Sequence, residues 1–229
     1  ELKPTLRALG VGVGAPGYAG YRHGIYRGVK VITAVTKMGL AAAQKATEEL
    51  FSNFGADIDH LFVVGIAGAC DLQLKIGEVV MPTSVVDERD GISRYPTNLS
   101  DFASAGLIYS TDQLAYSKEF VAMLHARKVS LVDMESGAIA AVCDRHKCPF
   151  TIIRAVSDRV DKHTESFDVF QLANDDGSPR YMAAIRYVLA KPSRIIYLAS
   201  MGLGAKKAIN ASSAALLENL VCMLSGEQM

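Results

Sequence analysis

The chain has 229 residues, of which 50% are hydrophobic and 21% are charged. This length and composition allow a substantial core and exclude an intrinsically disordered chain. Lysine plus arginine equals aspartate plus glutamate at 24 each, so the chain has no overall positive charge with which to hold nucleic acid or an anionic membrane.

Apolar strands alternate with amphipathic helices between residues 29 and 160. The β-branched run 29–35 predicts a buried strand. Residues 40–54 are rich in alanine and have the apolar spacing of a helix. The next strand, 60–64, leads into Gly65-Ile66-Ala67-Gly68-Ala69. Further strands are predicted at 77–86, broken by Pro82, and at 106–110, 130–132 and 150–156. Further helices are predicted at 117–124, 135–146, 181–189 and 211–224.

This order of elements predicts an α/β fold: a single-domain three-layer α/β/α sandwich with a mixed, largely parallel central sheet, over residues 1–190. The polar loop 174–179 separates that body from a helical C-terminal extension, 191–229. The apolar stripe of the extension packs on the body or mediates contacts between copies of the chain, and packing on the body is the preferred interpretation. In sheets of this kind, ligands collect at the carboxyl ends of strands.

The four cysteines, Cys70, Cys143, Cys148 and Cys222, are too few and too scattered for a secreted disulfide framework. Cys143, His146 and Cys148 stand within six residues, but no second pair of ligands completes a zinc site. No metal or cofactor is therefore expected. No apolar stretch approaches the roughly 20 residues that span a bilayer, and the first residues are not a secretory signal. These features predict a cytoplasmic protein.

The glycine-containing run 65–69 follows a buried strand. Its small residues let backbone amides approach a ligand closely, or they form a tight turn with no ligand. The lysine of a Walker loop and the third glycine of the dinucleotide fingerprint are both absent. The run therefore matches neither nucleotide-binding motif.

Two acidic motifs come from neighbouring segments, and both acids are expected to reach one edge of the sheet. Asp133-Met134-Glu135 stands where an apolar strand meets an alanine-rich helix, and Ser157-Asp158 closes the strand 150–156. Taken singly, Glu135 is equally a first-turn acid favoured by the helix dipole, and Asp158 a turn cap. Arg154, however, lies inside an apolar strand, where a charge needs an acidic partner or a ligand. Together the acids suit chemistry on a polyol with a leaving group, because one holds hydroxyls while the other supplies a proton.

Four motifs in this order carry a family resemblance: Gly-Ile-Ala-Gly at 65–68, Ile-Gly-Glu-Val-Val at 76–80, Asp-Met-Glu-Ser-Gly-Ala at 133–138 and Arg-Ala-Val-Ser-Asp at 154–158. Over roughly residues 24–170 the chain resembles the nucleoside phosphorylase and nucleosidase superfamily of the purine and uridine type, and within it methylthioadenosine/S-adenosylhomocysteine nucleosidases. The resemblance implies a nucleoside phosphorylase-like fold without a cofactor. It also implies cleavage of the N-glycosidic bond of a purine nucleoside by a cytoplasmic homodimer or higher homo-oligomer.

The resemblance also implies a role for each candidate site residue. Glu135, beside Met134, accepts hydrogen bonds from the ribose hydroxyls, and Asp158 protonates or hydrogen-bonds the purine ring nitrogen. Glycosidic cleavage passes through an oxocarbenium-like state, so a carboxylate on the sugar stabilises the growing positive charge. The resemblance further implies that Ser157 orients Asp158 and that Arg154 braces the acidic cluster, which includes Asp133. Ala67 and Gly68 would line the sugar side. Leu114 would contact the base, at a position where such nucleosidases often carry phenylalanine.

Water and phosphate are alternative nucleophiles. Phosphorylases hold the phosphate dianion with arginines and backbone amides, and in the family one such arginine lies two residues before the glycine loop, where this chain has Val63. This favours hydrolysis, for which the nucleosidase branch uses an N-terminal carboxylate, here Glu1 or a residue before it. The alternatives are a phosphate-dependent purine nucleoside phosphorylase and a catalytically silent nucleoside-binding module. The loop cations Arg22, Arg27, Lys37 and Arg94 are expected to be solvated surface charges.

Overall fold

The computed structural model describes residues 5–6, 9–11, 21–99, 106–113, 117–160 and 194–225, the last segment without side chains up to residue 201. A small hairpin is formed by β1 (Arg22–Tyr26) and β2 (Val29–Thr33). The helical elements are α2 (Leu40–Phe54), the 3-10 turn η1 (Gly55–Asp57), α3 (Lys118–Ala126), α4 (Ser136–His146) and α6 (Arg194–Ser225). The strands of the central sheet are β3 (Leu61–Ala69), β4 (Val79–Val80), β5 (Ser84–Asp87), β6 (Ser93–Arg94), β7 (Leu107–Ser110), β8 (Val129–Asp133) and β9 (Phe150–Arg159).

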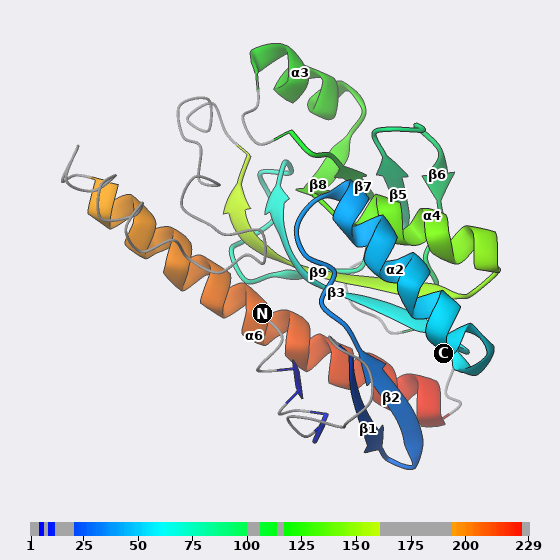
Figure 1. Ribbon diagram of the computed structural model, residues 1–229. Helices are drawn as coiled ribbons and strands as arrows, with labels where there is room; N and C mark the ends of the chain where they lie inside the picture. The colour runs from blue at the N-terminus through cyan, green and yellow to red at the C-terminus, as the bar shows by residue number, and fades with distance from the viewer. Residues whose placement is uncertain are drawn as a thin grey trace.

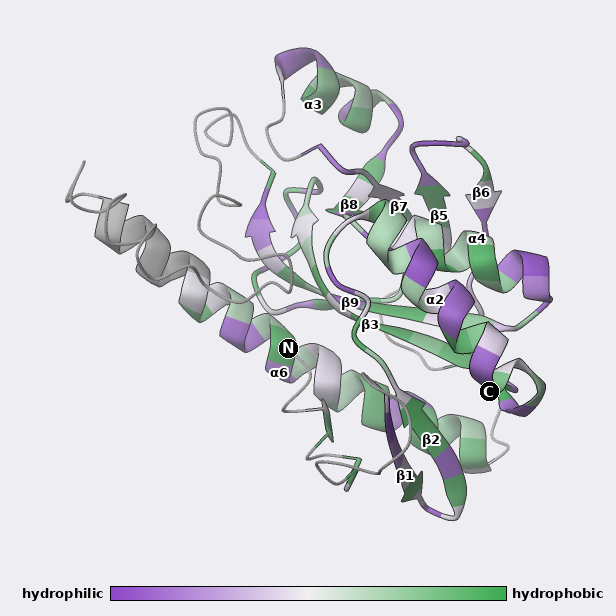
Figure 2. Ribbon diagram, in the orientation of Figure 1, coloured by the Kyte–Doolittle hydropathy of each residue, from purple (hydrophilic) through white to green (hydrophobic). Residues whose placement is uncertain are grey.

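The described residues form three layers, with α2 and α4 on one face of the seven-stranded sheet and α6 on the other (Figure 1). The strand order is β4-β9-β3-β8-β7-β5-β6. On the first face Leu40 and Ile139 share a core with Ile152 of β9, and on the other face Leu216 packs with Ile153. Alternate residues of β9 thus serve both layers. The middle parts of β3 and β9 are hydrophobic, whereas the carboxyl end of β9 is hydrophilic (Figure 2). The predicted α/β fold is confirmed.

The break predicted at Pro82 is confirmed. It divides residues 77–86 into two strands, β4 beside β9 and β5 beside β7, which lie on opposite parts of the sheet. Proline has no N–H to donate to a neighbouring strand, so a break at this position is physically reasonable. The predicted strand 60–64, in contrast, continues to Ala69. Gly65 to Gly68 therefore lie within β3 and are not a loop.

Strand β3 separates the two strands that carry the acidic motifs. It pairs in parallel with β9 and antiparallel with β8. Gly68 is opposite both Val132 of β8 and Asp158 of β9. The carboxyl ends of β8 and β9 therefore point in opposite directions, and the acids do not meet at one common edge of the sheet. They approach one another across β3 instead.

The C-terminal helix α6 is longer than the predicted helix 211–224. By length and composition alone, its segment Gly202–Ser225 is long and apolar enough to cross a membrane, contrary to the expectation that no stretch approaches that length. In the structure Ala215, Leu216 and Leu220 belong to the core that α6 shares with the sheet. The predicted helix 181–189 and the predicted loop 174–179 lie outside the described residues.

Gly204 allows α6 to touch β9. A Cβ built at Gly204 would lie 2.6 Å from the carbonyl oxygen of Ser157 and 3.3 Å from Cγ2 of Ile76. We expect Gly204→Ala to be about 1–3 kcal/mol less stable than Gly202→Ala, because overpacking at a close contact costs that much. Gly202 is a matched control, since a Cβ there meets no atom within 4 Å. Urea denaturation measures both, and equal free energies of unfolding would contradict the contact.

Candidate active site

Arg154 of β9 reaches across β3 to the acids that follow β8. Its Nη2 lies 2.7 Å from Oδ2 of Asp133 and 3.3 Å from Oε2 of Glu135, and its Nε donates to the Ser136 hydroxyl at 3.1 Å. Gly65 is the partner of Arg154 in the β3–β9 register, and a Cβ there would lie 2.1 Å from Nη1. The guanidinium therefore occupies the space that a side chain at residue 65 would take.

The carboxylate of Asp133 is bound by hydrogen-bond donors from neighbouring side chains and backbone. Its side chain is 1% exposed and that of Arg154 is 6% exposed. Besides Arg154, the carboxylate accepts from the hydroxyl of Ser110 and from the backbone N–H of Ser136 at 3.3 Å. The Ser110 hydroxyl in turn accepts from the N–H of Gly137 at 2.7 Å. Asp133 thus caps the start of α4 and forms an ion pair with Arg154, within the acidic cluster that Arg154 was expected to brace.

Glu135 immediately precedes α4 but does not cap it. Its side chain makes no capping hydrogen bond to that helix and is 18% exposed. One carboxylate oxygen, Oε2, faces Arg154, and the other, Oε1, accepts from the backbone N–H of Gly39 at 3.4 Å. The alternative interpretation of Glu135 as an acid that serves the first turn of α4 is therefore not supported. Its carboxylate points to the start of α2, and Met134 beside it is half-buried.

A β-bulge sets the position of Asp158. The β3–β9 register pairs Ala67 with Val156 and Gly68 with Asp158, which leaves Ser157 as an extra residue. A bulge of this kind re-aims a side chain at the end of a strand. The Ser157 hydroxyl lies 3.2 Å from the Ala67 carbonyl oxygen and within hydrogen-bonding distance of the Asp158 carboxylate. Ala67, Gly68, Ser157 and Asp158 therefore form one group.

The two acidic groups lie along the same stretch of β3. Arg154 is opposite Gly65 and Asp158 is opposite Gly68, which places the two β9 residues about 10 Å apart along the strand at ~3.3 Å per residue. Burial, and then the charge of Asp158, raise the pKa of the nearby Cys70 thiol to about 12. This thiol is therefore neutral at pH 7 and is no nucleophile.

Other predicted residues lie elsewhere. Glu1 and Leu114 are outside the described residues. Val63, at the family's phosphate-arginine position, is buried in the core. Arg94 is not the solvated surface charge that was expected, because its side chain is 9% exposed and its Nη2 lies 2.7 Å from Asp90. The sequence interpretation noted the segment 36–39 as a possible ligand position at a strand end, but it gave no role to Ser110 or Asp112. The polar run Ser110-Thr111-Asp112 at a strand end was a recognisable signal for them.

Comparison with known proteins identifies relatives that match most of this chain. The family model of the phosphorylase superfamily matches residues 11–189. An aminodeoxyfutalosine nucleosidase of Helicobacter pylori is 24% identical over 216 residues, which cover 81% of this chain and 93% of the relative. A 5′-methylthioadenosine/S-adenosylhomocysteine nucleosidase of Bacillus velezensis is 26% identical over 178 residues, covering 64% and 76%. Both names agree with the predicted class of enzyme.

Solved structures share the fold. The 5′-methylthioadenosine/S-adenosylhomocysteine nucleosidase of Helicobacter pylori with butyl-thio-DADMe-Immucillin-A superimposes with a TM-score of 0.70 at 21% identity, covering 96% of this chain and 92% of that one. Futalosine hydrolase of the same organism has a TM-score of 0.68 at 20% identity, covering 98% and 93%. The family match extends from the β1–β2 hairpin through every strand of the central sheet. The chain therefore belongs to the phosphorylase superfamily, as its motifs predicted.

Proposed function

We propose that this protein is a nucleosidase that uses water to cleave the N-glycosidic bond of a purine nucleoside of the methylthioadenosine, S-adenosylhomocysteine or aminodeoxyfutalosine type. The observation that carries the proposal is the pair of acidic groups beside β3, with Glu135 held by Arg154 and Asp158 within hydrogen-bonding distance of Ser157. The nucleosidase relatives support the reaction class. The names of these relatives give different substrates.

On the sugar side, Glu135 accepts hydrogen bonds from the ribose hydroxyls. As the glycosidic bond lengthens, positive charge develops on the ribose ring, and a nearby carboxylate stabilises it. Arg154 and the Gly39 amide fix the two oxygens of this carboxylate in different directions. A preorganised carboxylate needs no rearrangement at the moment of reaction, which is the main advantage of such a site.

On the base side, Asp158 transfers a proton to a ring nitrogen of the purine, so that the base leaves as a neutral molecule. Such general acid catalysis typically contributes about 10²–10⁴-fold to a rate.

Water is favoured over phosphate by the charges around the site. A phosphate dianion needs arginines or free backbone amides. Val63 is apolar and buried, and Arg94 is paired with Asp90. The amides of Gly39 and Leu40 at the start of α2 already donate to Glu135 and Asp112. An anion at this helix terminus would meet two carboxylates of the protein itself.

The test is release of base by the protein from 5′-methylthioadenosine and from inosine, with and without phosphate. Equal rates of adenine release in both buffers are expected. Formation of ribose 1-phosphate from inosine, dependent on phosphate, would instead identify a nucleoside phosphorylase. Nucleoside binding in calorimetry without any turnover would identify a silent binding module, and either result would overturn the proposal.

A further inference from the structure

Two consecutive amides at the start of α2 are bound by carboxylates from distant parts of the chain. The N–H of Leu40 donates to Oδ1 of Asp112 at 2.8 Å, and the N–H of Gly39 donates to Oε1 of Glu135 at 3.4 Å. Gly39 has no side chain with which to cap the helix. The first turn of α2 is therefore capped by Asp112, and it holds one oxygen of the sugar-binding carboxylate.

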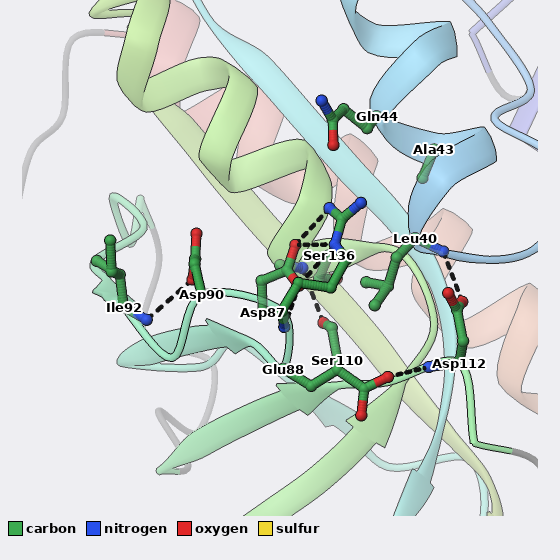
Figure 3. A network of polar contacts seen from close by, with 12 residues as sticks. Leu40, Ala43, Gln44, Asp87, Glu88, Asp90, Ile92, Ser110, Asp112 and Ser136 are labelled. Carbon is green, nitrogen blue, oxygen red and sulfur yellow. Dashed lines mark hydrogen bonds and ion pairs between the residues drawn. The ribbon is translucent and has the colours of Figure 1, made fainter.

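Asp112 is itself held in place by Glu88. The backbone N–H of Asp112 donates to Oε1 of Glu88 at 2.7 Å, and the hydroxyl of Thr111 donates to Oε2 at 2.6 Å. Figure 3 shows the Asp112 carboxylate directed at the Leu40 amide, with Glu88 at the Asp112 amide. Both oxygens of Glu88 thus fix the segment that follows β7, and this segment presents the capping carboxylate to α2.

The conformation of Gly39 makes the arrangement possible. Its φ of 100° lies in the region that glycine adopts without strain. A Cβ on Gly39 would also lie 3.2 Å from Oδ1 of Asp112. In this conformation the amides of residues 39 and 40 reach two different carboxylates, and the partial positive charge of the helix N-terminus stabilises both.

We infer that Asp112, supported by Glu88, is a positioning residue for Glu135. Asp112 fixes the first turn of α2, and the Gly39 amide in that turn then orients Oε1 of Glu135, while Arg154 orients Oε2. The inference rests on the proposed function, in which Glu135 binds the ribose hydroxyls. The inference goes beyond the proposed function because it names two residues outside the four family motifs, Asp112 and Glu88. These residues would set how strongly the enzyme prefers a ribose with both hydroxyls.

The experiment measures selectivity for the sugar. For the wild type and for Asp112→Ala we compare kcat/KM for 5′-methylthioadenosine with kcat/KM for its 3′-deoxy analogue, which lacks one hydroxyl. Loss of the cap is expected to reduce this ratio about fivefold, as the typical worth of a helix cap suggests. Asp112→Asn keeps an acceptor oxygen for the Leu40 amide and should retain most of the ratio. Glu135→Gln gives the ratio expected when the sugar contact itself is impaired.

A general loss of stability would lower both values of kcat/KM and leave their ratio unchanged, and that result in a folded Asp112→Ala protein would overturn the inference. Should Asp112→Ala fail to fold, Glu88→Gln provides the same comparison, because it loosens Asp112 without touching α2. Asp57→Ala, at an exposed position away from the site, is the matched control and should keep the wild-type ratio.

Failure of the proposed function would be recognised separately, as absence of base release by the wild type. The inference would then be tested by calorimetry, with adenosine and 3′-deoxyadenosine as ligands. Asp112→Ala is expected to reduce the preference for the intact ribose by the same factor. An unchanged preference for adenosine, or none in the wild type, would overturn the inference.

Discussion

Replacement of Asp158 by asparagine is expected to lower kcat for base release by about 10²–10⁴-fold and largely to spare nucleoside affinity. Asparagine has nearly the same shape and keeps an oxygen that accepts from the Ser157 hydroxyl. It has no carboxylic acid proton to transfer to the departing purine. Steady-state adenine release gives kcat, and calorimetry gives Kd for the nucleoside.

Asp57→Asn is the control for this substitution, because it removes one exposed carboxylate away from the site and should keep wild-type rates. A wild-type rate for Asp158→Asn would refute the assignment of the general acid. A loss of affinity as large as the loss of rate would show that Asp158 acts mainly in binding. The bulge at Ser157 should be unchanged, since backbone pairing with β3 does not involve the carboxylate.

Replacement of Arg154 by methionine is expected to lower the free energy of unfolding by about 3–5 kcal/mol, the usual result of removing one member of a buried ion pair. Methionine fills much of the volume but leaves Asp133, whose side chain is 1% exposed, without its guanidinium partner. Nucleoside binding should weaken too, because Oε2 of Glu135 loses the same partner. Urea denaturation measures the first effect and calorimetry the second.

The matched control is Arg145→Met. Arg145 forms an ion pair with Glu48 at the same 2.7 Å distance, but there the side chains are 51% and 46% exposed. Solvent screening limits such a pair to about 0–1 kcal/mol. Equal losses from the two substitutions would contradict the importance of burial. The double variant Arg154→Met/Asp133→Asn should recover part of the lost stability, because the buried charge is then absent.

Elements with a strong local pattern were predicted well. Residues 40–54 form α2 as expected, since their apolar side chains repeat at helical spacing and bury one face. The continuous apolar run of β9 was likewise recognisable, because both faces of that strand are covered. The break at Pro82 was recognisable, because proline cannot donate a backbone hydrogen bond, but the positions of β4 and β5 in the sheet were not. Their places at opposite parts of the sheet depend on partners far away in the sequence.

Local physical chemistry in the sequence alone determined which residues needed partners. A buried arginine such as Arg154 must meet an acid, and the order of the motifs around Glu135 and Asp158 identified the superfamily. Only the tertiary structure decided that β8 runs antiparallel to β3 and that Arg154 passes over Gly65 to reach its acids. It also decided that amides of α2 meet carboxylates 72 and 96 residues away. A backbone N–H is the same in nearly every residue, so the sequence carries no mark of which amide a distant carboxylate will bind.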